Sequence, residues 1–141
     1  MLELKVKYLA DIKPIVVEEK GDWIDLRSAE TIELEARQSA IIPLGVAIEL
    51  PEGYSAIIAP RSSTFKKWHI LQTNSIGVID NSYCGDNDEW CLPVYAISKT
   101  TIYKNDRICQ FRIIKNEPVS IMKVDKLGNP DRNGFGSTGV N

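Results

Sequence analysis

Hydrophobic and polar residues alternate at the start of the chain. Leu2, Leu4, Val6 and Tyr8 fall on one side of an extended backbone, and the residues between them are charged. A period of two is the pattern of a strand with one face buried and one face in water. The chain is therefore predicted to open with a half-buried β-strand.

Similar short runs continue along the chain and are rich in branched and aromatic residues. They cover residues 31–34, 39–50, 54–59, 91–97, 107–114 and 119–124. Turn residues separate them, for example at Gly21-Asp22 and Pro51-Glu52-Gly53. Helical spacing is confined to residues 62–68, where Ser62 or Ser63 could cap a helix of one or two turns. The pattern predicts an all-β sandwich or barrel.

Length and composition fit one compact domain. The chain has 141 residues, of which 43% are hydrophobic, and a domain of this size can bury a sufficient core. We expect a barrel domain over residues 1–125 and a flexible tail over residues 126–141, which holds four of the nine glycines. Without a long apolar run or a signal-peptide pattern, the protein is expected to be cytoplasmic, with no membrane partner.

Charge and cysteine content exclude several functions. The net charge of −2 and the absence of long basic runs argue against a nucleic-acid partner. Three cysteines without a CxxC pair suggest neither a disulfide framework nor a zinc site. His69 is the single histidine, and the sequence suggests no hydroxyl or thiol partner for it, which favours a structural role over a Ser-His-Asp triad.

The segment PRSS at residues 60–63 follows a predicted strand and opens the predicted helix. Arg61, Ser62 and Ser63 could bind an anion there together with unpaired backbone N–H groups. The same residues also fit a capped helix start with a solvated arginine.

The segment at residues 74–85 places Asp80 at the end of a predicted strand and Tyr83 in the following turn. A carboxylate beside an aromatic ring suits a general base next to a stacking surface. An Asx-turn followed by a core tyrosine is the alternative interpretation.

The C-terminal segment GFGSTG, preceded by Arg132, could bind phosphate through its glycines, hydroxyls and guanidinium. A disordered polar end explains the same composition, although Phe135 has no evident core to join. Asp25 and Gln110, taken alone, are ordinary surface residues.

Five segments, taken in chain order, resemble the five motifs of the trimeric dUTP diphosphatase (dUTPase) family. They are WIDLRSAE with Asp25, PRSS, residues 74–85, NDRICQF with Gln110, and GFGSTG. The resemblance covers Asp25 to Gly139 and is nearest in style to members from Gram-positive bacteria and their phages. It implies a distorted jelly-roll-like β-barrel that forms a homotrimer, with each active site built from three subunits. It also implies hydrolysis of dUTP to dUMP and pyrophosphate, which lowers dUTP and supplies dUMP for thymidylate synthesis.

The resemblance implies roles for the third motif. Asp80 would orient and deprotonate the water that attacks the α-phosphorus, and Tyr83 would stack under the deoxyribose and exclude a ribose 2′-hydroxyl. The turn that contains Asn74, Gly77 and Ile79 would recognise uracil through backbone groups and the Asn74 amide.

The other motifs would hold the phosphates. Arg61, Ser62, Ser63 and Gln110 would bind the phosphate chain. The tail would close over the nucleotide as a lid and clamp the terminal phosphate, through Arg132, Phe135, Gly136, Ser137 and Thr138. Mg²⁺ would be bound mainly by the phosphates and by water, with Asp25 reaching it through water.

The sequence departs from the family pattern at three places. Arg132 lies three residues before Phe135 instead of five. Residues 86–90 form an insertion whose Trp90 could cover the site, although packing is the more common role for a tryptophan. Asn81-Ser82 stands where an acidic residue often precedes the tyrosine, and we expect little effect from this change.

Two other functions remain open at this point. A dCTP deaminase shares the fold and the PRSS-like segment but needs a glutamate base on the hairpin, where this chain has GVIDNSY. A nucleotide-dependent binding protein, in which ordering of the tail exposes or hides a partner surface, is also compatible with the sequence.

Overall fold

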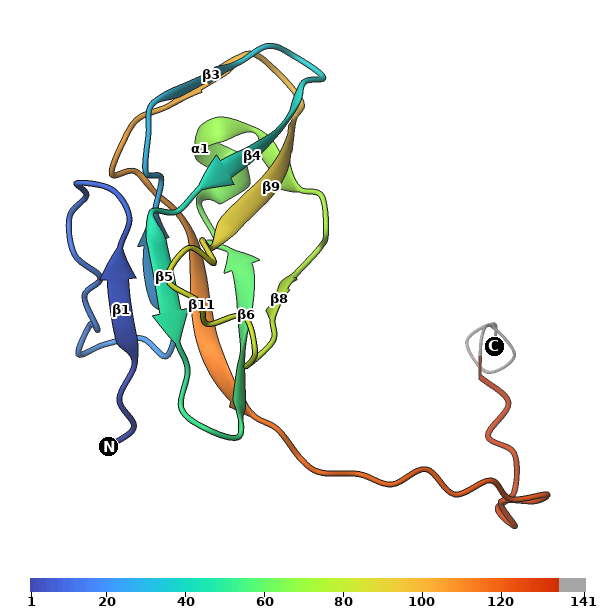
Figure 1. Cartoon of the computed structure of the whole chain (residues 1–141). Helices are drawn as coiled ribbons and strands as arrows, with labels where there is room; N and C mark the ends of the chain where they lie inside the picture. The colour runs from blue at the N-terminus through green and yellow to red at the C-terminus, as the bar shows by residue number, and fades with distance from the viewer. Residues whose placement is uncertain (135–141) are drawn as a thin grey trace.

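The computed structural model describes residues 1–134 and is built almost wholly from β-strands (Figure 1). The all-β prediction is confirmed. The strands are β1 (Lys5–Tyr8), β2 (Ile24–Arg27), β3 (Ile32–Leu34), β4 (Ser39–Pro43), β5 (Val46–Glu49), β6 (Tyr54–Pro60), β7 (Ile70–Gln72), β8 (Gly77–Ile79), β9 (Cys91–Ala96), β10 (Thr100–Ile102) and β11 (Arg107–Lys115). The one helix among the described residues is α1 (Thr64–Trp68).

The strands pair antiparallel in small sheets that enclose one core. The largest sheet has the order β2-β11-β6-β8, a second has the order β4-β9-β7, and β1-β5 and β3-β10 form two-stranded ribbons. Figure 1 shows β11, β6 and β8 side by side, with α1 at the end of β6. No helix in the described chain is long and apolar enough to cross a membrane.

A β-bulge in β11 sets the faces of the central strand. The pairing register between β11 and β2 shifts between Arg107 and Cys109, so Ile108 and Cys109 are both buried although they are neighbours in sequence. A bulge places two residues opposite one and turns the following side chains. Gln110 then faces away from the core and Phe111 faces into it, as the alternation predicts.

The long apolar run at residues 39–50 is two strands instead of one. Gly45 has φ +71°, and a Cβ atom there would lie 3.0 Å from Ile12 Cδ1 and 3.1 Å from Ala29 Cβ. The left-handed backbone and the close neighbours favour glycine at this position. The chain turns there, so that β4 and β5 belong to different sheets.

The predicted strand at residues 119–124 is wrong for the described chain. These residues pair with no strand there, and Val119 and Ile121 are 82% and 93% exposed. Figure 1 shows the segment after β11 leading away from the barrel. An extended segment needs a hydrogen-bonding neighbour to become a strand, and residues 1–134 place none beside it. The domain division at residue 125 stays a prediction. The last strand of the described chain ends ten residues earlier, at Lys115.

Trp90 is fully buried, so its predicted packing role is confirmed. Its ring contacts Phe111 edge to face, with ring centroids 5.1 Å apart and an interplanar angle of 86°. This geometry is favourable for two aromatic rings. The insertion at residues 86–90 therefore anchors itself in the core through its last residue.

Replacement of Trp90 by alanine is expected to lower the free energy of unfolding by about 3–5 kcal/mol, because it leaves a cavity beside Phe111. Urea unfolding followed by circular dichroism measures the loss. Trp23→Ala, which removes a half-buried tryptophan, is the matched control and should cost clearly less. Equal losses in the two variants would show that Trp90 is not a main part of the core.

Candidate active site

A cleft of about 720 Å³ opens at one end of the largest sheet. It contains four of the residues that the sequence singled out, from three segments that are distant in the chain. They are Asp25 on β2, Arg61 and Ser62 after β6, and Gln110 on β11. The order β2-β11-β6 explains this arrangement, because it places the ends of these strands next to one another.

The carboxylate of Asp25 lies at the centre of the cleft between two arginines. Its Oδ1 atom is 2.9 Å from Arg61 Nε, and its Oδ2 atom is 3.4 Å from Arg107 Nη1. Asp25 is directly opposite Gln110 in the pairing of β2 with β11. The two ion pairs partly neutralise the cations and hold their guanidinium groups in place.

Thr64 fixes the backbone at Arg61. Its hydroxyl accepts a hydrogen bond from the Arg61 N–H at 2.8 Å and donates one to the Ile108 carbonyl at 2.9 Å. The side chain is 3% exposed. Because Ile108 lies in the β11 bulge, Thr64 joins the helix to the strand that carries Arg107 and Gln110.

The predicted cap position is confirmed at Ser63, but the predicted side-chain capping bond is not formed. Ser63 occupies the N-cap position, but its side chain makes no capping hydrogen bond. The backbone of Ser63 has αR angles, whereas a capping side chain usually requires β-region angles. Ser62 is exposed and lines the cleft, while Ser63 is not among the lining residues.

Gln110 is hydrogen-bonded to the end of β6, next to Arg61. Its Nε2 atom donates to the carbonyl of Pro60 at 3.0 Å, one residue before Arg61. The amide is therefore held beside the start of the PRSS segment. The two predicted phosphate-binding segments form one continuous rim.

Sequence analysis missed several lining residues of the cleft. These are Arg107, Trp23, Glu18, Glu19 and Lys20. Arg107 could have been suspected from its place in the NDRICQF segment beside Gln110, although the bulge that turns it toward Asp25 has no sequence signature. Residues 18–20 precede β2 in a loop without periodicity, so nothing in their pattern marks them.

A basic hollow of about 310 Å³ adjoins the cleft and shares Arg61 and Arg107 with it. Its basic lining residues are Lys13, Arg27, Arg61, Lys67, Lys104 and Arg107. Asp106 is the one acidic residue of this lining, and its carboxylate accepts the N–H of Tyr103 within its own turn. The fold thus gathers positive charge that the sequence spreads over five segments.

Asp80 follows β8 and forms an Asx-turn. Its Oδ2 atom accepts hydrogen bonds from the Ser82 N–H, at 2.9 Å, and from the Ser82 hydroxyl. These bonds, the side-chain one first, lower the pKa of the Asp80 carboxyl. The carboxylate is exposed, so it is available to a ligand as an anion.

The Asx-turn of the alternative interpretation is confirmed, but its core tyrosine is wrong, because Tyr83 is not a core residue. Its side chain is 41% exposed, and its hydroxyl donates to the Glu89 carbonyl at 2.9 Å. Partial burial, followed by the nearby charges of Asp88, Cys91 and Glu89, raises the pKa of its phenol. The ring is fixed at its tip, with part of its surface open to a ligand.

The turn before β8 is tightly built. Gly77 is buried, and a Cβ atom there would lie 3.1 Å from Ile58 Cβ and 3.7 Å from Asn74 Nδ2. The Asn74 amide therefore lies against the backbone of Gly77. Ile79 packs partly on the core, which leaves the backbone and the exposed Asn74 as the groups that could recognise a base.

The described chain does not bring Asp80 to the cleft. Ile79 pairs with Ala56, which places Asp80 near Ser55, while Arg61 lies six residues further along β6 and its end. At about 3.3 Å per residue, this corresponds to roughly 20 Å. Asp80 and Tyr83 thus form one group of candidate residues, and the cleft residues form another.

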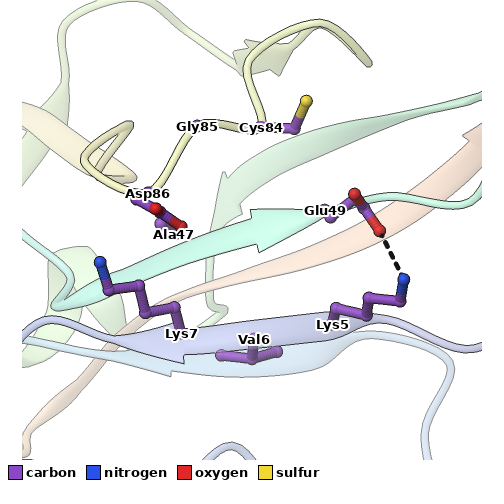
Figure 2. A pocket seen from close by; sticks show the side chains of 8 residues that line it. All are labelled: Lys5, Val6, Lys7, Ala47, Glu49, Cys84, Gly85 and Asp86. Atoms are coloured by element: carbon purple, nitrogen blue, oxygen red, sulfur yellow. Dashed lines mark ion pairs between the residues drawn. The ribbon is translucent and has the colours of Figure 1, made fainter.

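A second hollow, of about 240 Å³, lies beside the loop that follows Tyr83 (Figure 2). Figure 2 shows Lys5 and Lys7 on β1 on one side and Cys84, Gly85 and Asp86 on the other. Lys5 pairs with Glu49 at 3.1 Å. None of the predicted site residues lines this hollow.

The tail residues are only partly covered by the structure. Arg132 is exposed in the segment after β11. Phe135, Gly136, Ser137 and Thr138 lie outside the described residues.

His69 has a hydroxyl partner that the sequence did not suggest. Its Nδ1 atom lies 2.9 Å from the Ser98 hydroxyl. The residue ends α1 in a left-handed backbone conformation.

Comparison with known proteins decides the family. A family model described as dUTPase matches residues 20–139, which include all five motifs. The chain belongs to the dUTPase family. It is 54% identical over 141 residues to the SPbeta prophage-derived deoxyuridine 5′-triphosphate nucleotidohydrolase YosS of Bacillus subtilis, covering 99% of each chain.

More distant dUTPases are also similar to this chain. A deoxyuridine 5′-triphosphate nucleotidohydrolase of Finegoldia magna is 39% identical over 122 residues, covering 82% of this chain and 83% of the relative. The structure of a Staphylococcus bacteriophage 80alpha dUTPase with dUpNHpp matches with a TM-score of 0.83 at 24% identity, covering 98% and 99% of the two chains. The likeness to this dUTPase structure confirms the predicted fold.

Thr64→Val is expected to lower the free energy of unfolding by about 1–3 kcal/mol, because it leaves the Arg61 N–H and the Ile108 carbonyl without their buried partner. Thr64→Ser, which keeps the hydroxyl, is the matched control and should lose less. Urea unfolding measures both. A valine variant as stable as wild type would show that this bridge is not needed.

Proposed function

We propose that this chain is a dUTP diphosphatase that hydrolyses dUTP to dUMP and pyrophosphate, lowering dUTP and supplying dUMP for thymidylate synthesis. Family membership and the 54% identical relative support this activity. The structural observation that carries the proposal is the cleft, where Arg61, Ser62 and Gln110 surround Asp25. This arrangement suits a ligand with several phosphates.

The cleft binds the phosphate chain. Arg61 uses Nε for Asp25 and donates from Nη1 to the Arg107 carbonyl at 3.2 Å, which leaves its remaining N–H groups for phosphate oxygens. The Ser62 hydroxyl and the Gln110 amide add donors, and Ser63 can add its own. The adjoining basic hollow stabilises the negative charge further and attracts the substrate.

Magnesium fits this cleft as an ion bound chiefly by the substrate. Residues 1–134 contain no group of three or more His, Cys, Asp or Glu side chains arranged to hold a metal, and the Asp25 oxygens are already paired with arginines. A single carboxylate that contacts the hydrated ion through water matches the preference of magnesium. When bound, the ion neutralises phosphate charge that develops during the reaction. A phage phi11 dUTPase structure has been described with a structural Mg(II) ion.

Asp80 orients the attacking water and accepts its proton, and the water oxygen attacks the α-phosphorus. The low pKa of the carboxyl keeps it ionised, and its exposure lets water reach it. Tyr83 stacks under the deoxyribose, where a ribose 2′-hydroxyl would not fit. The Asn74 amide and the backbone around Gly77 and Ile79 recognise uracil.

The active site is shared between three copies of the chain. Asp80 lies roughly 20 Å from Arg61 along one chain, whereas proton transfer requires hydrogen-bond distance. A second copy therefore supplies Asp80 and Tyr83 to each cleft. The segment after β11, exposed and leading away from its own barrel, carries Arg132, Phe135, Gly136, Ser137 and Thr138 to the site of a third copy.

Mixing two inactive variants tests the shared site. Asp80→Asn and Arg61→Ala are each expected to lower kcat/KM for dUTP by at least about a hundredfold. When the two proteins are unfolded together and refolded as mixed trimers, about a quarter of the sites should combine an intact Arg61 with an intact Asp80 from the neighbouring chain. Activity should recover accordingly.

The control is a mixture of the two folded proteins without exchange of subunits, which should stay inactive. No recovery after verified exchange would mean that each site is built within one chain. Near-normal turnover by Asp80→Asn alone would remove Asp80 from the mechanism.

Removal of magnesium should abolish most of the turnover because the triphosphate then keeps its full charge. Pyrophosphate release is measured with EDTA, and again after excess magnesium is added, for dUTP, dCTP, dTTP and UTP. Of the four nucleotides, only dUTP should be hydrolysed rapidly. The added magnesium should restore dUTP hydrolysis after EDTA treatment. Ammonia release from dCTP would instead identify a deaminase.

A further inference from the structure

The Asp80 turn is held in place from both sides. The Asn81 amide donates to the carbonyls of Pro51 and Tyr54, at 2.9 and 2.7 Å, which ties the turn to the loop between β5 and β6. The Tyr83 N–H donates to the Asp80 carbonyl at 3.0 Å, and the Tyr83 hydroxyl is bound to Glu89. The backbone that carries Asp80 therefore has little freedom.

Within residues 1–134, Ser82 is the one hydrogen-bonding partner of the Asp80 side chain. Ser82 donates both its N–H and its hydroxyl to the same carboxylate oxygen, Oδ2. Among the hydrogen bonds of the described residues, none reaches Oδ1. A carboxylate with one oxygen held by two donors cannot rotate freely about its Cβ–Cγ bond, and its other oxygen keeps a defined direction.

We propose that Ser82 is a positioning residue of the reaction: it holds Oδ2 of Asp80 so that Oδ1 is presented to the attacking water. The proposal rests on the proposed role of Asp80 as the group that accepts the water proton. It departs from the expectation that Asn81-Ser82 has little effect. The Ser82 side chain adds a hydroxyl donor where an acidic side chain would add a like charge.

The electrostatic surroundings agree with this role. The lowered pKa of the Asp80 carboxyl has the Ser82 hydroxyl as its first cause and the Ser82 N–H as its second, opposed only by slight desolvation. No charged side chain of residues 1–134 contributes to this shift. Since a lower pKa also weakens a base, Ser82 acts by fixing the direction and the ionised state of the carboxylate.

The test compares Ser82→Ala with Ser82→Thr. The alanine variant keeps the backbone donor and loses the hydroxyl, so the pKa of Asp80 rises and the acidic limb of the kcat/KM profile moves to higher pH. At neutral pH, where Asp80 stays ionised, kcat for dUTP should fall about tenfold with little change in KM, because the carboxylate is less well oriented. Threonine keeps the hydroxyl and should restore both kcat and the pH profile.

Ser39→Ala removes another exposed serine, on β4, and should change nothing. Wild-type kcat and an unmoved acidic limb in Ser82→Ala would overturn the proposal. So would a loss of kcat without movement of the acidic limb, since that pattern indicates a merely structural effect.

A second measurement separates this proposal from the role of Asp80. Carboxyl ¹³C titration of free protein follows Asp80 directly, and its midpoint should rise in Ser82→Ala and return in Ser82→Thr. If the midpoint moves while Asp80→Asn keeps near-normal turnover, the contact is real and Asp80 is not the base. If the midpoint does not move, Ser82 does not control the carboxylate.

Discussion

The paired position of Asp25 between two arginines is the constraint on which the cleft depends. Arg61 and Arg107 would repel each other at this corner without an anion between them, and each donates to a different oxygen of the same carboxylate. On an open surface, ion pairs at these distances would contribute little to stability. Here the ladder of β2, β11 and β6 fixes all three backbones, so the carboxylate can hold both guanidinium groups in one orientation.

The β11 bulge and Thr64 make that geometry possible. The bulge buries Ile108 and Cys109 together and turns Arg107 toward β2, while the Thr64 hydroxyl joins the Ile108 carbonyl to the Arg61 N–H. Burial strongly raises the pKa of the Cys109 thiol, which keeps this neighbour of the ion pair uncharged. The rim of the cleft thus rests on a buried, neutral and hydrogen-bonded layer.

Most of the fold could be predicted from period-two alternation, because side chains with alternating burial leave a direct mark on the sequence. The strands at residues 91–96 and 107–115 are examples. The turn at Gly45 and the β11 bulge could not be predicted, since each depends on a distant neighbour. Residues 119–124 are also rich in branched apolar residues but have no pairing partner in the described chain, which shows that such a composition does not by itself make a strand. For the cleft, the motifs predicted residues that line it, including Asp25, Arg61 and Gln110. The contact of Arg107 with Asp25 depends on the pairing register, which the sequence does not show.

The separation of Asp80 from the cleft connects catalysis with assembly. Within one barrel, β8 pairs with residues 56–58 of β6 and runs away from Arg61, so that Asp80 follows β8 on the far side. A single chain can therefore carry the cleft and still lack, beside it, the group proposed to direct water. A carboxylate close to the phosphate-binding arginines in every monomer would be drawn into ion pairs with them, as Asp25 already is. On the proposed trimer, the hydrogen bonds from Ser82 keep the separate carboxylate oriented before the neighbouring cleft reaches it. An anion that is oriented in advance loses less freedom when substrate binds, which is the condition under which positioning lowers the barrier to phosphoryl transfer.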